Sequence, residues 1–146
     1  MAAAGEAPVR VLLVDHDASE IVATRFLLAR VVEARFIVDE AGSLSAAVQR
    51  LAKGDIDIVL LDSTLPDSDG LEALRTLQSR CPDTPVIILA SAGDRQWVSK
   101  ALEMGAKDCI VRDNVSSYLL ARIILRHPGR PVTVRNPAPF PVFALD

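Results

Sequence analysis

Three polar residues that could do chemistry follow the apolar run Val11–Val14: Asp15, His16 and Asp17. A run of this kind is typical of a strand that is buried on both faces of a sheet. In open parallel sheets, functional residues gather just beyond the carboxyl ends of the strands. Two carboxylates there could bind a cation, and the imidazole between them could stay neutral or carry a positive charge itself.

Other apolar runs end in further polar residues, which are Asp62, Ser63 and Thr64, then Ser91, and finally Arg112. If Asp15 and Asp62 lie close together, each raises the pKa of the other unless a cation joins them. Mg²⁺, which prefers oxygen ligands, is the usual cation in such a place. An aspartate beside it can act as a nucleophile toward a phosphoryl group, with a basic side chain and a hydroxyl stabilising the added charge.

Five strand-like runs alternate with segments of helical periodicity. The expected strands are Val9–Val14, Arg35–Asp39, Ile58–Leu61, Val86–Leu89 and Cys109–Val111. The expected buried helix stripes include Val98, Ala101 and Leu102, and later Val115, Leu119 and Ile123. This alternation predicts an α/β domain with a parallel sheet and right-handed crossovers.

The 146 residues suit one domain, which we expect at residues 8–127. Residues 1–7 are predicted to be a short tail, because they lack the features of a signal peptide. Five of the nine prolines fall after position 127, so residues 128–146 are predicted to be a Pro-rich tail or linker. No apolar run could span a membrane, two isolated cysteines favour a cytoplasmic location, and a net charge of −3 argues against direct contact with nucleic acid.

Three stretches together carry a family resemblance: "VRVLLVD", "DIVLLDSTLPDSDGLEAL" and "MGAKDCIVRDN". In this order and spacing they resemble the receiver domain of bacterial two-component response regulators. The resemblance implies a single doubly wound, flavodoxin-like sheet of five parallel strands in the order 2-1-3-4-5. It places Asp62 at the phosphoacceptor position. It also implies that Asp15, Asp62 and the backbone of Thr64 are ligands of Mg²⁺.

Several positions depart from the family pattern. His16 stands where the family has a second acidic ligand, so we expect the Mg²⁺ site to be weak. The switch hydroxyl is replaced by Ala90, although Ser91 follows and could reach a phosphoryl group. Arg112 replaces the family's lysine, and Cys109 replaces the switch aromatic.

These departures leave two hypotheses open. The first is a receiver that accepts a phosphoryl group from a histidine kinase or phosphotransfer protein. The second is a pseudo-receiver, an interaction module that works without phosphorylation. A small enzyme ranks lower, because the sequence has no glycine-rich phosphate loop. We therefore expect no enzymatic activity. Output is expected to reach an effector protein or domain, or a second copy of the chain, through the face of the fourth helix, the fifth strand and the fifth helix, which carries Trp97 and Tyr118.

Some polar residues have simpler structural interpretations. "DASE" is a capping box in which Asp17 caps a helix and Glu20 stands three residues later, with Asp17 as a replacement metal ligand the alternative. Asp67 and Asp69 are expected to serve a turn and the start of the next helix. Trp97 and Tyr118 lie off the apolar stripes, so either contact with a partner or partial burial would explain them.

Overall fold

The structure, a computed structural model, describes residues 7–127. The expected tail at 128–146 and positions 1–6 of the expected N-terminal tail lie outside these residues. The strands of the main sheet are β1 Val9–Val14, β2 Phe36–Ala41, β3 Ile58–Asp62, β6 Val86–Ala90 and β7 Asp108–Val111. The helices are α1 Ala18–Ala29, α2 Leu44–Ala52, α3 Gly70–Arg80, α4 Arg95–Glu103 and α5 Ser117–Arg126.

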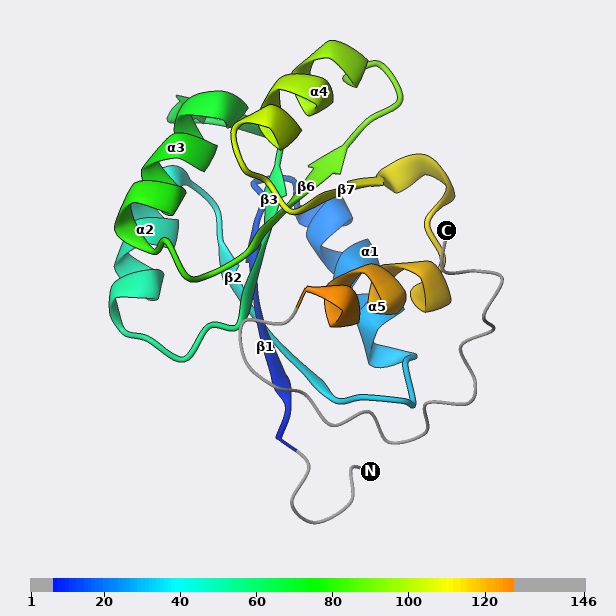
Figure 1. Ribbon diagram of the computed structural model, residues 1–146. Helices are drawn as coiled ribbons and strands as arrows, with labels where there is room; N and C mark the ends of the chain where they lie inside the picture. Colours follow the sequence, from blue (N-terminus) through cyan, green and yellow to red (C-terminus); the bar gives the residue numbers. More distant parts are fainter. Residues whose placement is uncertain (1–6, 128–146) are drawn as a thin grey trace.

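The five strands are parallel and pair in the order β2-β1-β3-β6-β7. This order confirms the predicted doubly wound topology. Helices α1 and α5 cover one face of the sheet, and α2, α3 and α4 cover the other (Figure 1). Because β1 and β3 are neighbours at the centre, the residues that follow them meet at one edge of the sheet.

Alternating side chains of the central strands form two separate cores. Leu12 and Val14 of β1 pack under α2, α3 and α4, whereas Val11 and Leu13 pack under α1 and α5. All four side chains are completely buried. A strand with helices on both faces has no solvent-exposed side, which explains why its sequence reads as a continuous apolar run.

Polar residues mark the helix starts. Asp17, Ser43 and Asp69 accept backbone N–H bonds from the first turns of α1, α2 and α3. The predicted caps Asp17 and Asp69 are therefore confirmed. Gly54 follows α2 with φ +82°, a conformation that glycine adopts without a steric cost.

The structure corrects several element boundaries. Strand β2 runs from Phe36 to Ala41 and not from Arg35 to Asp39. Strand β7 starts one residue earlier than expected, at Asp108. Two short elements near the sheet edge were not predicted: the hairpin of β4 (Thr64–Leu65) and β5 (Ser68–Asp69), and the 3₁₀ turn η1 (Arg112–Asn114).

Two predicted helix stripes are partly wrong. On α4, Leu102 is 42% exposed, while Trp97 packs against the core beside Val98. On α5, Leu119 is 42% exposed, and Leu120 takes the buried position instead. The other predicted stripe residues do lie in or against the core: Val98, Ala101, Val115 and Ile123.

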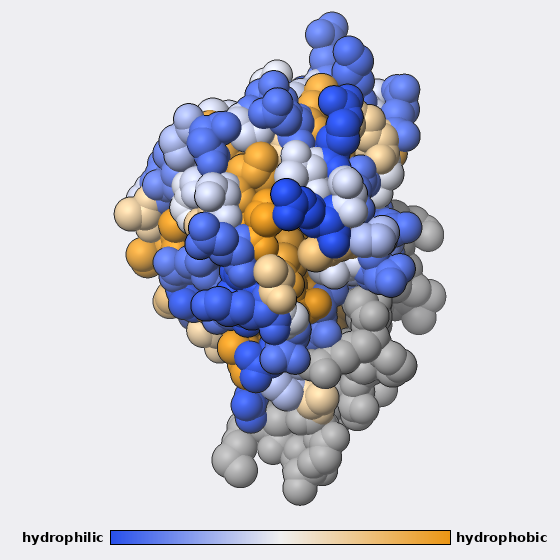
Figure 2. Space-filling model, turned by 90° about the vertical axis from the view of Figure 1, so that its left-hand side faces the viewer, coloured by the Kyte–Doolittle hydropathy of each residue, from blue (hydrophilic) through white to orange (hydrophobic). Residues whose placement is uncertain are grey.

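The side formed by α2 and α3 is mostly hydrophilic, with a narrow hydrophobic strip between charged side chains (Figure 2). No helix within residues 7–127 is long and apolar enough to cross a membrane.

Candidate functional site

The carboxyl ends of β1, β3 and β7 bring four of the sequence-predicted residues together. Asp15, His16, Asp62 and Arg112 line one pocket of about 220 Å³. Thr64 and Ser91, the other two predicted site residues, line the same pocket. The expectation that these residues gather at one edge of the sheet therefore agrees with the structure.

Arg112 joins the two aspartates at the centre of the pocket. Its Nη2 atom lies 2.9 Å from Oδ2 of Asp15 and 2.9 Å from Oδ1 of Asp62. The Nη1 atom lies 3.9 Å from Oε1 of Glu20 on α1. The guanidinium is nearly buried, so it offsets two carboxylates in a place where water screens charge poorly.

Asp62 stands between two basic side chains. Its Oδ1 atom faces Arg112, and its Oδ2 atom lies 3.6 Å from Nδ1 of His16. Burial raises the pKa of Asp62 and Asp15 raises it further, while the positive charge of Arg112 opposes this rise. The Asp62 side chain is 14% exposed, so it is accessible from the pocket.

Asp15 is held from both sides. Its Oδ1 atom accepts a hydrogen bond of 3.0 Å from the backbone N–H of Asp17. The predicted capping box is therefore only half formed, because this N–H is used by Asp15 and Glu20 lies toward Arg112 instead. Asp17 itself caps α1, and its hydrogen bonds with Ser19 and Glu20 lower its pKa. The structural interpretation of Asp17 is the one that these contacts support.

Asp94 is a site residue that the sequence analysis missed. Its Oδ2 atom accepts hydrogen bonds from Oγ of Ser63, at 3.1 Å, and from the backbone N–H of Ser91, at 2.8 Å. It thereby links the residue after Asp62 to the loop after β6. In the sequence, Gly93-Asp94 is no more than a turn signal, because sequence spacing does not show which loops meet across a sheet edge.

Three of the residues predicted to lie at the cation site form a compact set. One ligand atom each from Asp15, His16 and Asp62 lies within 4.8 Å of the others. Two carboxylates and the backbone at Thr64 suit a divalent cation of the kind that the resemblance implies. Mg²⁺, however, requires near-ideal octahedral oxygen geometry, and His16 supplies nitrogen at one corner of this set. The residues fit a divalent cation but fit Mg²⁺ poorly.

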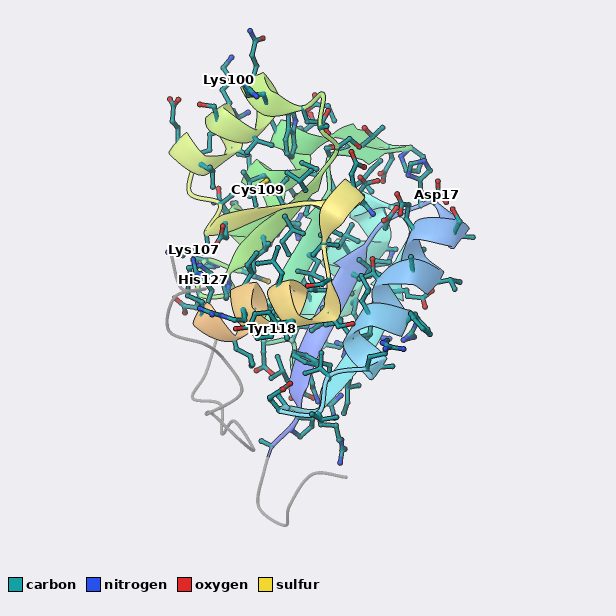
Figure 3. The ribbon with its side chains drawn as sticks, turned by 90° about the vertical axis from the view of Figure 1, so that its right-hand side faces the viewer. Asp17, Lys100, Lys107, Cys109, Tyr118 and His127 are labelled. Atoms are coloured by element: carbon teal, nitrogen blue, oxygen red, sulfur yellow. The ribbon has the colours of Figure 1, made fainter. Side chains whose placement is uncertain are left out.

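The predicted switch positions lie on β6 and β7. Ala90 is completely buried, and Cys109 is partly buried on β7. Burial raises the pKa of the Cys109 thiol, and the negative charges of Asp108 and Asp94 add to this effect. The face formed by α4, β7 and α5 lies next to these positions. Figure 3 labels one residue on each of its elements: Lys100 on α4, Cys109 on β7 and Tyr118 on α5.

Comparison with known protein families decides the classification. Residues 11–124 match the model of the response regulator receiver domain. The chain belongs to the response regulator receiver domain family. The predicted family and its phosphorelay role in two-component signal transduction are thus confirmed.

The curated relatives of this chain are regulators of several kinds. The probable transcriptional regulatory protein SilR of Salmonella typhimurium is 32% identical over 126 residues, which cover 85% of this chain and 54% of that protein. The chemotaxis protein CheY of Listeria monocytogenes is 40% identical over 76 residues, 52% of this chain and 64% of CheY. The chain spans about half the length of the curated relatives it matches.

Solved structures agree on the fold. The N-terminal signal receiver domain of a response regulator from Bacteroides fragilis has a TM-score of 0.75 at 20% identity, covering 86% of this chain and all of that one. The receiver domain of sensor histidine kinase PA1611 from Pseudomonas aeruginosa has a TM-score of 0.70 at 24% identity, covering 83% of this chain and 98% of that one. That structure holds a magnesium ion in its active site cleft.

Proposed function

We propose that Asp62 is the phosphoryl acceptor of this receiver domain. The observation that carries the proposal is the position of its carboxylate, at the end of a central strand, partly exposed in a pocket and 2.9 Å from the guanidinium of Arg112. The proposed donor is a phosphorylated histidine of a histidine kinase or phosphotransfer protein, the partners of two-component systems.

In this reaction an oxygen of Asp62 bonds to phosphorus as the bond between phosphorus and the donor's imidazole nitrogen breaks. The electron pair of the broken bond stays on that nitrogen, which leaves in a neutral imidazole. The acyl phosphate that forms carries more negative charge than the carboxylate it replaces. Arg112 is in place to pair with this charge through charge-assisted hydrogen bonds.

Other pocket residues have supporting roles in the proposal. Asp15, Asp62 and the backbone carbonyl of Thr64 would hold a divalent cation, which would offset negative charge when bound. Because His16 takes the place of an oxygen ligand, Mg²⁺ binding is proposed to be weak. Ser91 lines the pocket and would offer a hydroxyl to the phosphoryl group.

Acetyl phosphate followed by intact-protein mass spectrometry tests this assignment. The wild type should gain the mass of one phosphoryl group, and Asp62→Asn should gain none. Asp113→Asn is the matched control, because it makes the same chemical change at an exposed carboxylate next to Arg112. Equal labelling of wild type and Asp62→Asn would rule out Asp62 as the acceptor.

The output of the domain is a separate proposal. We infer that the face of α4, β7 and α5 contacts an effector protein or domain, or a second copy of the chain. It adjoins the phosphorylation pocket through Arg112, which directly follows β7. A cytoplasmic location, where histidine kinases present their phosphohistidine, fits this role and remains a prediction.

A further inference from the structure

We propose that Nδ1 of His16 is a ligand of a divalent cation in the pocket, and that it raises the preference for ions with an affinity for nitrogen, such as Zn²⁺ or Co²⁺, over Mg²⁺ beyond that of a site built from oxygen ligands alone. The inference concerns the same pocket as the proposed phosphoryl acceptor, and it deepens that proposal by naming the cation class. Imidazole is a good ligand for these ions and a poor one for Mg²⁺. The proposal rests on three observations.

The first observation is that the two carboxylate oxygens of Asp62 have different neighbours. Arg112 contacts Oδ1, which leaves Oδ2 facing His16 with 3.6 Å between Oδ2 and Nδ1. This separation is too long for a hydrogen bond between the two groups. It is close to the roughly 3.4 Å that separates two ligand atoms of a tetrahedral Zn²⁺ ion with bonds of about 2.1 Å. The pair is therefore spaced to share an ion.

The second observation is the state of Asp15. Its side chain is completely buried, it lines the pocket, and Oδ2 accepts no hydrogen bond from the described residues although Arg112 lies 2.9 Å away. The other oxygen is fixed by the N–H of Asp17. A carboxylate oxygen has more than one acceptor direction, so Oδ2 can face Arg112 and still bind an ion. Asp15 is thus a third ligand, oriented before any ion arrives.

The third observation is the balance of charge. Five carboxylates line the pocket, and Arg112 is the only guanidinium among its lining residues. The excess of negative charge attracts a cation. Arg112, however, already forms ion pairs with Asp15 and Asp62, which lowers the affinity of these two carboxylates for an ion that binds through oxygen ligands alone. A nitrogen ligand adds affinity for Zn²⁺ or Co²⁺ that Mg²⁺ cannot use. The two effects together shift the site away from Mg²⁺.

Calorimetric titration of the full chain with Zn²⁺, Co²⁺ and Mg²⁺, without any phosphodonor, measures the selectivity directly. Any site with nitrogen or oxygen ligands binds Zn²⁺ more tightly than Mg²⁺, so the decisive quantity is how the affinity ratio changes on substitution. His16→Asp should lower the ratio of Zn²⁺ to Mg²⁺ affinity at least tenfold, in part by strengthening Mg²⁺ binding. The Co²⁺ complex of the wild type should show visible absorption that changes in this variant.

Two further variants keep the test decisive. His16→Ala should weaken Zn²⁺ binding without improving Mg²⁺ binding, and it serves if His16→Asp does not fold. His127→Gln is the matched control, since His127 pairs with Asp108 away from the pocket and should leave the ratio unchanged. An unchanged ratio in both His16 variants, or an equal loss in His127→Gln, would overturn the proposal. Because phosphorylation is not measured, that failure would leave the role of Asp62 untouched.

Discussion

Arg112 neutralises the buried carboxylate of Asp15 through an ion pair of 2.9 Å between Nη2 and Oδ2. The Asp15 side chain is completely buried, and that of Arg112 is 11% exposed. An uncompensated charge in such a place is costly, because water can no longer solvate it. The pair therefore links the stability of the fold to the same residue that contacts Asp62, the proposed phosphoryl acceptor.

We expect Arg112→Ala to destabilise the protein by about 3 kcal/mol, the usual cost of leaving one partner of a buried pair alone. Arg112→Lys should cost less, since it keeps the positive charge. Urea denaturation measures both changes. Arg75→Ala, at an exposed position on α3, is the control and should stay within about 0.5 kcal/mol of the wild type. A similarly small effect of Arg112→Ala would show that the pair adds nothing.

Phosphorylation is predicted to couple only weakly to the face of α4, β7 and α5. In the family, a hydroxyl moves toward the phosphoryl group and an aromatic side chain fills the space it leaves. Here these positions hold Ala90 and Cys109, so a phosphoryl group has less differential interaction with the two states. Partner affinity or self-association, measured with and without beryllofluoride after its binding is confirmed, should change less than about tenfold, or 1.4 kcal/mol.

Ala90→Ser tests the physical reason for this weak coupling, because it restores a hydroxyl at the end of β6. The effect of beryllofluoride on partner binding should then increase. A change beyond tenfold in the wild type would contradict the prediction and would point to another route. Ser91, whose backbone N–H donates a hydrogen bond to Asp94, is the first candidate for that route.

Asp67 is predicted to make stability depend on pH. Its two carboxylate oxygens accept hydrogen bonds from the backbone N–H groups of Leu44 and Ser45 at the start of α2. These bonds lower the pKa of Asp67 below its ordinary value of 3.8. A lowered pKa contributes stability above the unfolded-state value, and this contribution is lost as pH falls through the folded-state value.

Asp67→Asn should therefore have a lower melting temperature than the wild type at neutral pH, and the difference should shrink below pH 3.8. Thermal unfolding followed by circular dichroism across this range measures the effect. A difference that is independent of pH would show that the charge of Asp67 is unimportant to α2.

Gly70 is predicted to be intolerant of a side chain. A Cβ atom there would lie 2.0 Å from Cζ2 of Trp97 and 2.6 Å from the backbone oxygen of Ser63. Gly70→Ala should cost about 1–3 kcal/mol, the usual range for overpacking. In a Trp97→Ala background, Gly70→Ala should cost less than it does in the wild type, because the clash with the Trp97 ring is gone. Some cost should remain, because the Ser63 oxygen cannot move as easily as a side chain.

Gly93→Ala is the matched control for Gly70→Ala, because a Cβ atom at Gly93 would meet nothing within 4 Å. Chemical denaturation of these variants, of Trp97→Ala alone and of the wild type gives the comparison. If Gly70→Ala and Gly93→Ala are equally stable, the close approach of Trp97 to Gly70 that the structure shows does not restrict the side chain at that position.

The sequence by itself determined the sheet and the place of its site. Buried strands such as β1 and β3 are continuous apolar runs, and a buried parallel strand leaves few other interpretations. Asp15 and Asp62 end these runs, so the parallel arrangement alone brings them to one edge. Helix caps such as Asp17 and Asp69 were also predictable, because a cap acts on the next few residues.

Only the tertiary structure decided contacts between segments far apart in the chain. Asp67 binds the start of α2, 22 residues before it, and Asp94 joins Ser63, 31 residues before it. The sequence likewise did not determine which face of α4 and α5 is buried, since each helix has apolar residues on more than one face. On α4, packing against the sheet places Trp97 against the core and leaves Leu102 exposed. Such contacts depend on how elements dock in three dimensions, which local spacing does not encode.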